Sequence, residues 1–155
     1  EAINIFRSSP SIFETLQENV RAARAILDKL DCITIPSHPA SPTIHIHIKS
    51  LPQQPASGGL HPNSAALISP TKHARDAAQR EWDIEGEERL LQEVVEECLA
   101  QGVMITRAKR LRGQEFVEAR PSIKLAITAG LTKKETEKAV GVLKVALVKV
   151  LSRRR

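Results

Sequence analysis

The chain of 155 residues contains no tyrosine, one tryptophan and three phenylalanines. Aromatic side chains are the platforms on which single-stranded nucleic acids stack, and they dominate many large apolar cores. Their scarcity argues against nucleic-acid binding by base stacking, and it means that aliphatic side chains must build the core. Apolar residues make up 41% of the chain, which is enough for one globular domain of this length.

Cysteine is scarce as well. Cys32 and Cys98 lie far apart and no signal-peptide pattern precedes them, so we expect free thiols in a reducing compartment instead of a disulfide framework.

No apolar run approaches the length of a membrane span, and no Arg-rich amphipathic presequence opens the chain. Because the chain starts with Glu1 inside an apolar pattern, we expect it to be a piece of a longer polypeptide.

The formal net charge is +5, and the positive residues gather at 107–112 and in the tail at 153–155. No nucleic-acid motif or aromatic residue accompanies Arg107, Lys109, Arg110 and Arg112. We favour a solvated or partner-binding rim for this cluster. Nucleic acid and an anionic lipid surface are the alternatives.

Apolar periodicity predicts three helices. The first begins with a capping box of Ser11 and Glu14, and the second runs from Ile84 to a left-handed cap at Gly102. The third begins with a capping box of Thr132 and Glu135. Apolar stripes at spacings of three and four support the first and third: Ile12, Phe13, Leu16, Val20, Ala23, Leu27 and Leu30, then Ala139, Val142, Leu143, Ala146, Leu147, Val150 and Leu151.

Three short strands are predicted between these helices. "TIHIHIK" at 43–49 alternates strictly, so its isoleucines face a core. The other two strands cover 103–106 and 123–127, and Pro121 sets the chain extended before the last. Pro, Gly, Ser and Gln dominate 50–80, which we interpret as a flexible insertion. The predicted fold is one α+β domain over 1–155, with a small, mostly antiparallel three-stranded sheet and helices packed on one face.

Candidate chemistry is sparse. His45 and His47 share the strand face directed away from the core, a spacing found in some zinc sites, but no third ligand is evident. A solvated or interface-facing strand surface is therefore the preferred interpretation of the pair. The sequence shows no nucleophile elbow, triad or paired carboxylates, so we expect no catalytic residue and no metal site.

Four segments together resemble the C-terminal part of the α-oxoamine synthases, a family of pyridoxal-phosphate enzymes with the aspartate-aminotransferase (type I) fold. They are "IFETLQENVRAARAIL" at 12–27, "PTIHIHIK" at 42–49, "ERLLQEVVEECLAQGVMITRAKRL" at 88–111 and "PSIKLAITAGLTKKETEKAV" at 121–140. Within the family, the chain is most similar to the non-catalytic long-chain-base subunits of serine palmitoyltransferases. The resemblance covers nearly the whole chain apart from 50–80. It is supported by the order of the four segments and not by any single motif.

This resemblance implies the small C-terminal domain of a subunit in a heterodimer that condenses L-serine with palmitoyl-CoA to 3-ketodihydrosphingosine. Pyridoxal phosphate would be held by the catalytic subunit, and this chain alone would be inactive and bind no cofactor. The parent protein would lie at the endoplasmic reticulum membrane, with this domain on the cytosolic side.

Two residues are candidates for substrate-side or subunit contacts. Catalytic relatives carry Arg-Pro-Pro, a loop and a second arginine on the strand, whereas here Arg120 and Pro121 are followed almost at once by Lys124. Leu131 also replaces a histidine of those relatives. The resemblance therefore implies a retained scaffold in which Arg120 is a rim or subunit-contact residue. The alternative for the whole chain is an unrelated basic α+β module that docks an acidic partner.

Overall fold

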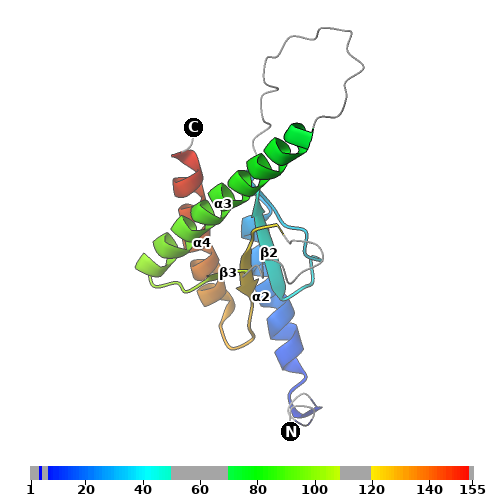
Figure 1. Cartoon of the computed structure of the whole chain (residues 1–155). Coiled ribbons are helices and arrows are strands. Elements are labelled where there is room, and N and C mark those ends of the chain that lie inside the picture. Colours follow the sequence, from blue (N-terminus) through cyan, green and yellow to red (C-terminus); the bar gives the residue numbers. More distant parts are fainter. Residues whose placement is uncertain (1–3, 5–6, 50–69, 109–119, 154–155) are drawn as a thin grey trace.

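The computed structural model describes residue 4 and residues 7–49, 70–108 and 120–153 (Figure 1). Within these described residues, three long helices and four strands follow one another. Figure 1 shows α2 and α4 running in the same general direction, with α3 crossing α4. The elements are α2 (Ser11–Leu27), β1 (Ile33–Thr34), β2 (Thr43–Ile48), α3 (Pro70–Ala100), β3 (Thr106–Arg107), β4 (Ile123–Ala126) and α4 (Lys133–Ser152).

The strands form one antiparallel sheet in the order β1-β2-β4-β3. In the central pair, Ile44 lies opposite Leu125 and His45 lies opposite Lys124. The predicted α+β class is confirmed, but the prediction of three strands is wrong because β1 pairs Ile33 and Thr34 with the end of β2. A strand of two residues is too short to show an alternating pattern.

One face of the sheet is apolar and carries the core. Ile44, Ile46 and Ile123 are fully buried, and Leu125 is almost so. All three helices contribute to this same core, which confirms the expectation that they pack on one face of the sheet. Their core residues are Ala23 and Leu27 of α2, Leu90, Leu91, Val94 and Cys98 of α3, and Val140, Leu143, Ala146, Leu147 and Val150 of α4.

Of the two predicted capping boxes, one is present in the structure and the other is absent. Thr132 has extended backbone angles, its hydroxyl accepts from the Glu135 amide, and the Glu135 carboxylate accepts from the Thr132 amide at 2.8 Å, so this capping box is confirmed. The capping box of Ser11 and Glu14 is wrong. The N-cap residue is Pro10, which has helical angles and no side-chain cap bond. Ser11 is the first residue of the helix, one position too late to act as the N-cap.

Gly102 ends α3 as predicted, with φ at 79°. The Gly102 amide donates to the Leu99 carbonyl and the Val103 amide donates to the Cys98 carbonyl, each at 2.9 Å. These two bonds form a Schellman motif, which requires the left-handed conformation that glycine adopts without steric cost.

The start of α3 was predicted incorrectly. The helix begins at Pro70 instead of Ile84, so 70–80 is helical and does not belong to an irregular insertion. This first part contains few large apolar residues, and good helix formers such as alanine, arginine and glutamine take the place of an apolar stripe. Residues 50–69 of the predicted insertion lie outside the described residues. β3 also lies slightly later than predicted, at Thr106–Arg107.

Candidate functional site at the Arg120 edge of the sheet

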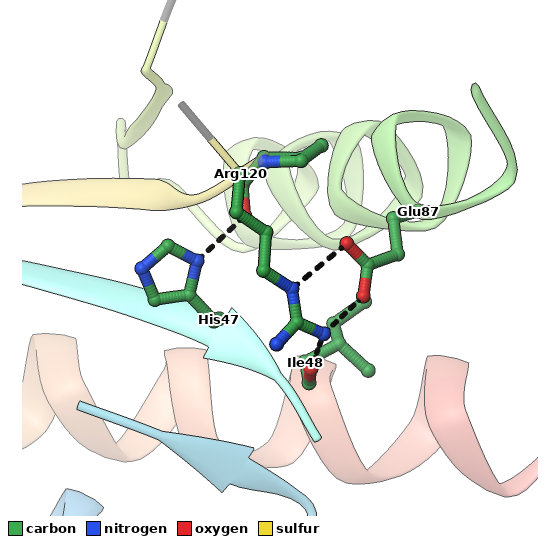
Figure 2. A network of polar contacts seen from close by, with 5 residues as sticks. His47, Ile48, Glu87 and Arg120 are labelled. Carbon is green, nitrogen blue, oxygen red and sulfur yellow. Dashed lines mark hydrogen bonds and ion pairs between the residues drawn. The ribbon is translucent and has the colours of Figure 1, made fainter. Parts of the chain in front are cut away.

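Arg120 joins three elements where the central strand β2 ends and the central strand β4 begins (Figure 2). Its Nε donates to one carboxylate oxygen of Glu87 on α3 at 3.2 Å, and one of its Nη atoms pairs with the other oxygen. The same Nη donates to the carbonyl of Ile48, the last residue of β2, at 2.5 Å. The guanidinium therefore ties the chain just before β4 to both α3 and β2.

Hydrogen bonding to Glu87 raises the pKa of Arg120 above its usual value, so this side chain stays charged. The Glu87 side chain is only 17% exposed, whereas that of Arg120 is 42% exposed. Two parallel bonds from a guanidinium are the geometry with which an arginine also grips the carboxylate of a free amino acid. In this chain the carboxylate of Glu87 receives both bonds.

His47 and His45 of β2 face away from the core as predicted, but both are half-buried. The His47 Nδ1 lies 2.9 Å from the Pro121 carbonyl oxygen, and since a carbonyl only accepts, this nitrogen carries the proton. The His45 Nδ1 lies 3.0 Å from the hydroxyl of Ser122, a residue that is 2% exposed. Both imidazoles are therefore held in fixed orientations against the start of β4.

Lys124 is exposed on β4, opposite His45 on one side and Thr106 on the other. Arg120 instead binds Glu87 and Ile48. The structure therefore places the two predicted contact residues in different surroundings.

The basic cluster is described only at its beginning. The Arg107 Nε donates to the Gln92 side chain at 3.0 Å, and an Nη lies 3.9 Å from the Glu88 carboxylate. Arg107 therefore contacts α3. The other predicted members, Lys109, Arg110 and Arg112, lie outside the described residues, as do the last two arginines of the tail.

Sequence reasoning missed two polar residues. Glu87 gave no signal, because nothing in the sequence pairs a carboxylate on a helix with an arginine 33 positions later. Asn19 is 1% exposed, and its Nδ2 donates to the carbonyls of Thr128 and Leu131 at 2.9 and 2.8 Å. Its position three residues after Leu16, within an apolar stripe, is the signal that could have identified it.

Among the side chains that the structure describes, no three histidine, cysteine or acidic groups gather closely enough to bind a metal ion. Within the same residues, no helix has both the length and the apolar character needed to span a bilayer.

The chain is 22% identical over 148 residues to serine palmitoyltransferase 1 of Dictyostelium discoideum. The alignment covers 93% of this chain and 25% of that protein, so the chain spans about a quarter of its relative's length. No family model matches the chain. The similarity supports a relationship to this serine palmitoyltransferase subunit.

Proposed function

We propose that this chain is the small C-terminal domain of the non-catalytic subunit of serine palmitoyltransferase. In this proposal the enzyme condenses L-serine with palmitoyl-CoA to 3-ketodihydrosphingosine, and the domain is part of the scaffold that holds the catalytic subunit. The observation that carries the proposal is the similarity to serine palmitoyltransferase 1 over 93% of the chain. A match of that extent involves the helices and strands together instead of one short motif.

The pairing of Arg120 with Glu87 supports the non-catalytic part of the proposal. An arginine that grips the carboxylate of serine needs both ends of its guanidinium fork for the substrate. Here the fork is engaged by Glu87 and Ile48. Releasing it would leave a carboxylate that is 17% exposed without its cation, which opposes exchange for a substrate.

The lysines whose exposure the structure describes do not fit a role in binding pyridoxal phosphate. A Schiff-base lysine is activated by desolvation or by a neighbouring cation in a closed site. Every lysine whose burial the structure describes is exposed: Lys29, Lys49, Lys124, Lys133, Lys134, Lys138, Lys144 and Lys149. The proposal therefore assigns the cofactor to the catalytic subunit. It also includes the location of the enzyme at the endoplasmic reticulum membrane.

The test is co-purification of the full-length parent protein. Tagged parent protein, expressed in its own cells, should bring down a second subunit whose absorbance shows bound pyridoxal phosphate, and the pair should make 3-ketodihydrosphingosine. The parent protein alone should show neither the absorbance nor the activity. A parent protein that binds pyridoxal phosphate by itself, or one that recovers no such partner, would contradict the proposal.

A further inference from the structure

Two polar side chains are buried in the helices α2 and α4, which contact each other and run in the same general direction (Figure 1). Asn19 of α2 is 1% exposed and Thr136 of α4 is 3% exposed. Each interrupts an apolar face, since the next buried residues of the two helices are Val20 and Val140. A buried polar group costs free energy unless it is hydrogen-bonded, so each of the two side chains needs a partner.

The orientation of the Asn19 side-chain amide is fixed by its own contacts. Its Nδ2 donates to the carbonyls of Thr128 and Leu131 at 2.9 and 2.8 Å. Because a carbonyl only accepts, the two ends of the amide cannot be exchanged. The Asn19 Oδ1 is buried, and no described residue donates a hydrogen bond to it. Asn19 therefore presents one buried acceptor that still requires a donor.

Thr136 contributes a second buried group of complementary chemistry. Its amide donates to the Thr132 carbonyl at 3.0 Å, so its backbone belongs to the first turn of α4. Its Oγ1 is buried and has no hydrogen-bond partner among the described residues. A hydroxyl both donates and accepts, whereas an amide oxygen only accepts.

Both groups lie beside Leu131. Thr132 is the N-cap of α4, so Leu131 is the residue before the cap and Thr136 is the fourth residue of the helix. Side chains at these two positions commonly pack against each other, and a helical side chain tilts toward the N-terminus of its helix. Asn19 reaches the same residue from α2, since its Nδ2 is bonded to the Leu131 carbonyl.

A single water molecule suits this pair of atoms. Buried waters typically make about three hydrogen bonds to polar groups that have no other partner. Water can donate to an amide oxygen and accept from a hydroxyl at the same time. A metal ion suits the place less well, because among the described side chains no three histidine, cysteine or acidic groups gather.

We propose that the Asn19 Oδ1 and the Thr136 Oγ1 bind one buried water molecule, which links α2 to the first turn of α4. The water donates one hydrogen to the amide oxygen and accepts the hydrogen of the hydroxyl. Asn19 then joins three parts of the domain, because its Nδ2 already binds the segment between β4 and α4. This proposal does not depend on the proposed function.

The experiment is a crystal structure of the full-length parent protein at a resolution that shows ordered water. We expect one water within about 2.5–3.0 Å of both oxygens. Thr136→Ser, which keeps the hydroxyl, should retain this water, and Thr136→Val, which has the same shape without it, should lose it. The matched control is Thr15→Val, which removes a hydroxyl of α2 that donates to the Ser11 carbonyl at 3.1 Å and should retain the water.

Melting temperatures provide a second readout. Thr136→Val should lower the melting temperature more than Thr15→Val, because it leaves the buried Asn19 oxygen without a donor. Three structural results would overturn the proposal: a direct bond between the two side chains, no water between them in the wild type, or a water that persists in Thr136→Val. The wild-type and Thr136→Ser structures decide the first two even if Thr136→Val does not fold.

Discussion

Replacing Arg120 with alanine tests the contact that joins α3 to the sheet. The substitution removes a bidentate pair with Glu87 and a bond to the Ile48 carbonyl. Charge-assisted hydrogen bonds are worth about 1.5–3 kcal/mol when they are shielded, but exposed ion pairs give about 0–1 kcal/mol. Because Arg120 is 42% exposed and Glu87 is 17% exposed, we expect a loss of roughly 1–2 kcal/mol of unfolding free energy.

The assay is urea denaturation of the chain with a double-mutant cycle of Arg120→Ala and Glu87→Gln. The coupling energy between the two positions should be about 1 kcal/mol and should shrink in 1 M salt. The single Arg120→Ala change should lower the melting temperature by roughly 2–8 °C for a chain of this size. Arg120→Lys should recover only part of this loss, because a lysine lacks the planar fork. Additive effects in the cycle, or an unchanged midpoint for Arg120→Ala, would refute the reasoning.

The remaining predictions concern stability. Thr132→Ala should cost about 1 kcal/mol in urea denaturation by removing the cap of α4, whereas Thr132→Ser should cost little. Asn19→Ala should cost roughly 1–3 kcal/mol, because the carbonyls of Thr128 and Leu131, between β4 and α4, lose their buried donor on α2. The bond from Lys149 lowers the pKa of Glu97 from its usual 4.5, so this carboxylate stabilises the fold above pH 4.5 and less as pH falls. Glu97→Gln should therefore melt below the wild type at pH 7, and the difference in melting temperature should shrink as the pH falls below 4.5.

Much of the framework could be predicted because local rules decide it. The strict alternation of 43–49 identified the core-facing isoleucines of β2, and the pattern Thr132 with Glu135 identified a true cap. Gly102 was predictable because only a left-handed residue ends a helix in this way.

Other features depend on contacts distant in sequence. β1 exists because β2 offers it a partner, and its two residues carry no pattern of their own. The pairing of Glu87 with Arg120 is set by the way α3 packs beside the sheet. The capping box of Ser11 and Glu14 matched the local rule but failed, because Pro10 extends the helical conformation and places Ser11 inside α2. Local patterns therefore predicted the elements better than the polar contacts between them.

The central claim is that this domain is a required structural part of a serine palmitoyltransferase. The most direct measurement is complementation of a strain lacking the parent subunit by the full-length protein or by a version truncated before Ser122. The truncation removes β4 and α4 with seven buried apolar side chains, each contributing about 1.5–3 kcal/mol when large and fully buried: Ile123, Leu125, Val140, Leu143, Ala146, Leu147 and Val150. We predict that the truncated protein fails to restore sphingoid-base synthesis, whereas Lys138→Ala restores it, and normal synthesis with the truncated protein would contradict the claim.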